Sequence, residues 1–117
     1  MNLELDHVFI LVEPQAKVAD LLVELGLKES FSREHKGQGT TNRRFEFDNG
    51  MLEFLWIHNE QESNNGPAHG LKLVERASNI DASPFGLIVK RKDNDTLEMP
   101  FKGFEYQPDF FKAPMSF

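Results

Sequence analysis

Residues 3–12 read LELDHVFILV, an alternating stretch that becomes continuously apolar toward its end. This pattern predicts a mostly buried β-strand. Strict alternation places His7 and Phe9 on one face of that strand and Asp6 on the other. A polar ring on an apolar face needs a hydrogen-bonding partner. His7 is therefore either a hydrogen-bonded core histidine or a functional residue.

A helix is expected directly after this strand. Pro14 suits a first helical turn, where its missing N–H costs nothing. Gly26 stands where a helix commonly ends in left-handed backbone. The apolar residues between them recur at the spacing of one buried stripe: Val18, Leu21, Leu22 and Leu25.

Three further strands are predicted before residue 60. Residues 28–34 are polar and suit an edge strand. Residues 43–48 (RRFEFD) alternate, and the Asp48-Asn49-Gly50 turn joins them as a hairpin to residues 51–58 (MLEFLWIH). The first half of the chain therefore reads as strand, helix and three strands.

The second half is less regular. Residues 59–67 (NEQESNNGP) read as a polar loop and mark the best boundary. A short helix is expected around 69–77 and an apolar strand at 85–90. From residue 97 onward an aromatic stretch is interrupted by prolines, which excludes a long helix or a central strand there. We expect this tail to wrap across a sheet or close a pocket.

Composition excludes several classes of protein. The 117 residues carry a formal net charge of −6, which argues against a general nucleic-acid binder. There is no cysteine, so disulfides, thiolate metal sites and cysteine nucleophiles are absent. The sequence shows no signal peptide and no apolar run long enough to cross a membrane. We expect a single cytoplasmic domain.

Glu53 is the second candidate functional residue after His7. It shares a strand face with Met51, Leu55 and Ile57. A carboxylate on such a face is costly unless it meets a cation, a metal or several donors. Glu53 is therefore either a solvated edge residue or a functional one, and it would be the catalytic proton carrier if the protein is an enzyme.

The third candidate is the glycine-containing run from His35 to Arg43. Its glycines allow close backbone approach, and His35, Asn42 and Arg43 could donate hydrogen bonds to an anionic or carbonyl-bearing ligand. The alternative is a plain connection between strands. Three aromatic residues complete the predicted ligand-binding set, although each could equally be structural: Trp56, Phe85 and Tyr106.

Several of these stretches resemble the glyoxalase-like branch of the vicinal-oxygen-chelate superfamily. They are residues 5–12, the predicted helix, residues 35–43 (HKGQGTTNR) and residues 49–55 (NGMLEFL). The resemblance implies an α+β fold of βαβββ modules that form a half-barrel cleft. It implies one complete module over residues 1–58 and a short or degenerate second module of helix, strand and aromatic tail over residues 68–117.

The resemblance also implies two metal-ligand positions. The superfamily places a His or Glu on the first strand and a Glu on the fourth strand of each module, and His7 and Glu53 fall on these positions. The matching first-strand position of the second module holds Pro84, Phe85 and Gly86, none of which can ligate an ion through its side chain. Two ligands rarely make a good divalent site. A bound divalent metal is thus less expected than none.

Three functions remain open. The first is a metal-free small-molecule binding protein with a cleft for a hydrophobic or anionic ligand. The second is a metal-dependent lyase, isomerase or dioxygenase whose site is completed across a dimer. The third is a ligand-free interaction module or a truncated structural one. Because a lone half-barrel leaves a strand edge and an apolar face to cover, we expect a homodimer.

Overall fold

The computed structural model describes residues 3–30, 32–92, 105–106 and 115–116. Its elements follow one another in this order: β1 (Leu3–Leu11), α1 (Lys17–Glu24), β2 (Arg33–His35), β3 (Thr40–Phe47), β4 (Gly50–Ile57), α2 (Glu60–Asn65), the 3₁₀ helix η1 (His69–Leu71), α3 (Leu73–Ala77), β5 (Phe85–Arg91), β6 (Glu105–Tyr106) and β7 (Met115–Ser116). No helix among these residues is long and apolar enough to span a bilayer.

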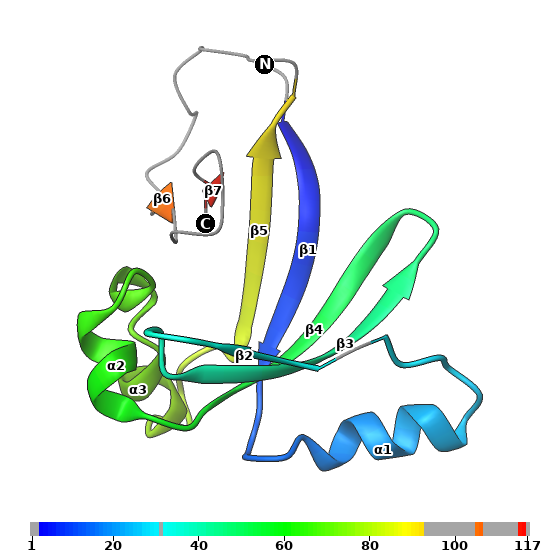
Figure 1. Ribbon diagram of the computed structural model, residues 1–117, viewed down its shortest axis with the longest axis horizontal. Helices are drawn as coiled ribbons and strands as arrows, with labels where there is room; N and C mark the ends of the chain where they lie inside the picture. The colour runs from blue at the N-terminus through cyan, green and yellow to red at the C-terminus, as the bar shows by residue number, and fades with distance from the viewer. Residues whose placement is uncertain (1–2, 31, 93–104, 107–114, 117) are drawn as a thin grey trace.

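The strands form one curved, open sheet in the order β2-β3-β4-β1-β5-β7-β6 (Figure 1). Strands β2, β3 and β4 pair antiparallel as a meander, and β1 joins β4 in parallel. The expected βαβββ order and the α+β half-barrel fold are confirmed. The hairpin at Asp48 and Asn49 is also confirmed, since Phe47 pairs with Gly50 across it.

Strand β1 contains an irregularity that the sequence pattern did not predict. Against β5, Leu5 is the partner of Val89 and His7 is the partner of Ile88, so Asp6 is the extra residue of a β-bulge. The expectation that Asp6 points away from His7 is therefore wrong, because a bulge breaks strict alternation. Both residues line the same cavity.

Both faces of the sheet bury apolar side chains. On one face, Ala19 of α1 and Ala16, the residue just before the helix, pack against three aromatic residues of β3 and β4, which are Phe45, Phe54 and Trp56. On the other face, the η1–α3 segment packs Leu73 against Phe9, Leu55 and Ile88. Helix α1 thus lies on one side of the sheet, while α2 and α3 lie on the other (Figure 1). Side chains on the two faces of β4 therefore pack in two separate hydrophobic clusters.

The prediction of which apolar residues α1 buries is largely wrong. Val18, Leu21 and Leu25 are 41%, 52% and 72% exposed, whereas Ala19 is fully buried and Leu22 is partly buried. The small alanine side chains bring the helix close to the aromatic sheet face, so the longer side chains are turned outward. The predicted end is confirmed, because Gly26 has a φ of 99°.

Two expectations for the second half need correction. The loop predicted at 59–67 contains α2, which Asn59 caps by accepting a hydrogen bond from the Glu62 backbone N–H at 3.1 Å. The single helix predicted at 69–77 is divided, because Lys72 takes a left-handed conformation with φ 54° between η1 and α3. The strand predicted at 85–90 is confirmed as β5.

Candidate functional site

A cavity of about 240 Å³ lies between the sheet and the segment that carries η1 and α3. One part of its wall is apolar and comprises Phe9, Met51, Leu55, Ala68, Leu71, Leu73 and Ile88. The rest of its wall is polar and comprises Asp6, His7, Arg33, His35, Gln38, Thr40, Asn42, Arg44 and Glu53. A concave site with one apolar and one polar wall is the usual form of a small-molecule pocket.

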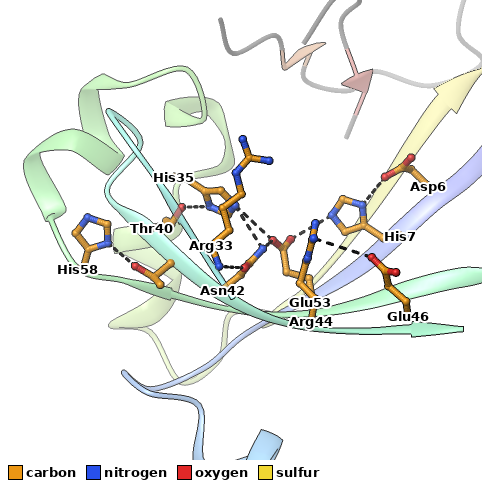
Figure 2. A network of polar contacts seen from close by, with 11 residues as sticks. Asp6, His7, Arg33, His35, Thr40, Asn42, Arg44, Glu46, Glu53 and His58 are labelled. Atoms are coloured by element: carbon orange, nitrogen blue, oxygen red, sulfur yellow. Dashed lines mark hydrogen bonds and ion pairs between the residues drawn. The ribbon is translucent and has the colours of Figure 1, made fainter. Parts of the chain in front are cut away.

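His7 lies between two carboxylates at the polar wall (Figure 2). Its Nδ1 is 2.6 Å from Asp6 Oδ2, and its Nε2 is 3.1 Å from Glu53 Oε1. A carboxylate accepts hydrogen bonds, so both ring nitrogens are best satisfied when both carry a proton. The geometry therefore favours an imidazolium between two carboxylates.

Asn42 determines how the rest of the network is oriented. The Arg33 backbone N–H donates to Asn42 Oδ1 at 2.9 Å, which identifies the other end of the amide as the NH₂ group. That group donates to Glu53 Oε2 at 2.5 Å and lies 3.4 Å from His35 Nε2. Since Asn42 is 1% exposed, the core around it keeps this orientation.

The orientation of Asn42 decides the tautomer of His35. An amide NH₂ facing His35 Nε2 requires an unprotonated nitrogen there. The proton of the neutral ring is then on Nδ1, which donates to Thr40 Oγ1 at 2.8 Å. His35 is thus expected to be neutral while His7 is charged, although both lie near Glu53.

The pKa values follow the same logic. Burial opposes ionisation of Glu53, yet hydrogen bonds from His7 and Asn42 outweigh it and lower the Glu53 pKa. Burial opposes the charged form of His7 as well, but hydrogen bonds and charges of Glu53 and Asp6 raise its pKa overall. For His35, burial lowers the pKa, and the nearby positive charges of Arg33 and Arg44 act in the same direction.

This arrangement makes the stability contributed by His7 dependent on pH. A raised folded-state pKa means that the contribution is fully present below the unfolded value of about 6.5 and is lost as pH rises through the folded value. We therefore expect the melting-temperature difference between the natural chain and His7→Gln to be larger at pH 6 than at pH 9.5. Glu53 remains ionised throughout this range. A difference that grows toward high pH would contradict the imidazolium.

Two of the sequence-predicted site residues lie on the opposite face of the sheet. Arg43 donates to Glu29 Oε1 at 2.6 Å and to Asp20 Oδ1 at 2.8 Å, which ties β3 to the segments around α1. These hydrogen bonds raise the Arg43 pKa. Trp56 packs in the aromatic core under α1. Neither side chain lines the cavity, because alternation along β3 and β4 points both away from it.

Of the other two aromatic candidates, Phe85 is not among the described residues that line the cavity. Phe85 is 58% exposed and pairs with Ile10 across the strands. Tyr106 pairs with Met115 between β6 and β7, and its side chain lies outside the described residues. The four candidates that do come together are His7, His35, Asn42 and Glu53.

Sequence reasoning missed several polar residues of the cavity: Asp6, Arg33, Gln38, Thr40 and Arg44. Arg44 could have been found, because continuing the alternation of the predicted strand 43–48 back by one residue places Arg44 on the same face as Asn42, which was already a candidate. Gln38 could not, because its burial depends on how the Gly37–Gly39 loop packs against α2. An added Cβ at Gly39 would lie 2.0 Å from the Asn59 carbonyl oxygen, which shows how closely that loop is seated.

The acidic and imidazole groups of the cavity are paired with one another. Among the described residues, no group of three or more His, Asp or Glu side chains is placed so that it could hold a metal ion. Both ring nitrogens of His7 face carboxylates, so a metal would have to displace a proton from the ring before His7 could bind it. Both Glu53 oxygens accept hydrogen bonds within the protein. A substrate could therefore give a proton to Glu53 only by displacing His7 or Asn42.

Comparison with known proteins agrees with this architecture. No curated protein and no solved structure matches the chain. Residues 5–99 match the glyoxalase-like domain family, which is part of the vicinal-oxygen-chelate superfamily. The match covers the βαβββ elements, the η1–α3 segment and β5. The chain therefore belongs to the glyoxalase-like domain family.

Proposed function

We propose that the protein is a metal-free small-molecule binding protein of the glyoxalase-like fold. The observation that carries the proposal is the cavity, whose polar wall is already organised by internal hydrogen bonds while its other wall is apolar. An organised site loses little entropy when a ligand enters. The apolar wall supplies the area that drives binding.

The proposal does not assign catalysis to Glu53. A general base works best with a pKa near the operating pH, whereas the pKa of Glu53 is lowered by its hydrogen bonds to His7 and Asn42. The donor set likewise gives no support to the metal-dependent lyase, isomerase or dioxygenase. The ligand-free alternative depends on whether the aromatic tail fills the cleft, and that tail falls mainly outside the described residues.

A thermal-shift screen tests the proposal. Small metabolites and drugs are added singly to the protein, first with a chelator and then with Mg²⁺, Mn²⁺ or Zn²⁺. We expect at least one small molecule to raise the melting temperature with chelator present, because a ligand that binds the native state stabilises it. Stabilisation that appears only with a divalent ion would support the metal enzyme. A screen without any stabilising compound would contradict a binding function.

We also propose that the chain is a cytoplasmic homodimer. Leu5, Phe85 and Leu87 on β1 and β5 are 52%, 58% and 60% exposed, and a second copy would remove this apolar surface from water. Light scattering at micromolar concentration should give twice the mass of the 13.5 kDa chain. Leu87→Lys should shift the equilibrium toward monomer. A monomeric natural chain would contradict the dimer.

A further inference from the structure

We propose that the ligand is an uncharged and mainly apolar molecule, about the size of one substituted aromatic ring. Its body would lie against the apolar wall that Phe9, Leu73 and Ile88 form. This inference rests on the proposed binding function and names the chemical class that the cavity selects. It decides between the hydrophobic and the anionic ligand that the sequence left open.

The acidic groups of the cavity are balanced by neighbouring donors of the protein. His7 lies between Asp6 and Glu53, with distances of 2.6 and 3.1 Å to the two carboxylates. The second Glu53 oxygen accepts a hydrogen bond from Asn42, and Asp6 Oδ1 lies 3.4 Å from Lys90 Nζ. An ammonium ligand would lose its hydration and meet only carboxylates that already have partners. The cavity therefore does not favour a cation.

The basic and amide groups of the same wall are engaged as well. Arg44 pairs with Glu46 at 4.0 Å. Arg33, Gln38 and Arg44 each have further interactions within the protein. A carboxylate ligand would have to replace these partners, and it would lose its own hydration when it entered. The cavity therefore does not favour an anion either.

The polar side chains form a network that can stay intact beside an apolar ligand (Figure 2). His35 Nδ1 donates to Thr40 Oγ1 at 2.8 Å, and Asn42 accepts from the Arg33 backbone N–H at 2.9 Å. Burying a polar group is costly mainly when its hydrogen bond is lost. Because these bonds are internal, an uncharged molecule can cover the polar wall without breaking them.

The apolar wall supplies the gain in free energy on binding. Phe9, Leu55, Leu73 and Ile88 pack in one cluster, and each is at most 5% exposed. All four line the cavity. A molecule that covers their cavity-facing surface removes it from water, and its own apolar surface is removed with it. An apolar ligand gains from both surfaces without a cost for desolvating a charge.

The cavity volume limits the size of the ligand. A cavity of ~150 Å³ lined by Leu, Ile and Phe can hold benzene, whereas sites for drug-sized molecules span ~300–1,000 Å³. The volume here, about 240 Å³, lies between these values. One aromatic ring with a short substituent fits this size, and a nucleotide does not.

The test compares three probes of similar shape by isothermal titration calorimetry at pH 7.5. Ethylbenzene is uncharged, benzylamine is a cation and benzoate is an anion at this pH. We expect saturable binding of one ethylbenzene per chain, about tenfold or more tighter than binding of either charged probe. Added salt should leave ethylbenzene binding unchanged, because no ion pair forms with it.

Two variants locate the bound probe, and a third is their control. Ala68 is buried and lines the cavity, so Ala68→Met should fill part of it and weaken ethylbenzene binding about tenfold or more. Leu71→Ala removes part of the apolar wall, should also weaken binding, and keeps the test valid if Ala68→Met does not fold. Ala77→Met makes the same change as Ala68→Met at an exposed position at the end of α3, and should leave the affinity unchanged.

The outcomes separate this inference from the function on which it rests. If benzylamine or benzoate binds as tightly as ethylbenzene, the cavity does not select uncharged ligands, and only the inference is overturned. If Ala77→Met weakens ethylbenzene binding as much as Ala68→Met does, the probe lies elsewhere and the inference fails. If ethylbenzene does not bind, the inference fails, and the binding function fails with it only when the thermal-shift screen is also negative.

Discussion

Glu53→Ala is expected to destabilise the protein by about 3–5 kcal/mol, the range found when one partner of a buried ion pair is removed. Glu53 is 6% exposed and accepts hydrogen bonds from both His7 and Asn42. Alanine would leave the His7 charge and the Asn42 amide buried without their acceptor. Because a small domain is stable by about 5–15 kcal/mol, this is a large share of the total.

Glu53→Gln is the matched control for this prediction. Glutamine keeps the shape and one acceptor oxygen, but its NH₂ group would face a donor on one side. We expect a loss of about 1–3 kcal/mol, the cost of one buried unsatisfied polar contact. Urea unfolding followed by circular dichroism measures both variants. An alanine variant within about 1 kcal/mol of the natural chain would show that the network does not hold the site together.

Gly39→Ala is expected to destabilise the protein by about 2–5 kcal/mol through two separate effects. Gly39 has a φ of 72°, where a side chain is strained. Its added Cβ would also lie 2.0 Å from the Asn59 carbonyl oxygen and 2.7 Å from the Ser63 backbone nitrogen. Both are backbone atoms of α2 or its cap, so relief requires moving the loop that carries Gln38.

Gly37→Ala separates the two effects. Gly37 has a similar φ of 77°, but an added Cβ there meets nothing within 4 Å. We expect only the conformational cost of about 1–2 kcal/mol. Guanidinium unfolding of both variants gives the comparison directly. A Gly37→Ala variant as unstable as Gly39→Ala would contradict the close packing of this loop against α2.

Much of the fold was predictable because its signals are local. Alternation and turn residues identified β1, the β3–β4 hairpin and β5, and Gly26 marked the end of α1. The face that α1 buries was not predictable, because the partner surface decides it. The aromatic side of the sheet accepts Ala16 and Ala19 at close range, and this outweighs the longer apolar side chains of the helix.

The site was only partly predictable, because it also depends on how segments distant in the sequence pack together. Strand alternation put His7 and Glu53 on apolar faces, and the parallel pairing of β1 with β4 brings these side chains to 3.1 Å. The bulge at Asp6 added a second carboxylate that alternation had assigned to the other face. The loop pattern led to Arg43 as the predicted ligand-binding arginine. The structure places Arg44 in the cavity wall instead, because adjacent strand residues point in opposite directions.

The account depends most on the claim that the cavity between the sheet and the η1–α3 segment is the binding site. Methyl-labelled NMR during titration with a compound that raises the melting temperature in the thermal-shift screen tests this claim directly. Ile88 lines the cavity and is 5% exposed, whereas Ile80 is 99% exposed and lies outside it. We predict saturable shifts of the Ile88, Leu55 and Leu73 methyl groups, with those of Ile80 and Leu21 unchanged. Shifts confined to Ile80 or Leu21, or no saturable shift at all, would contradict the account.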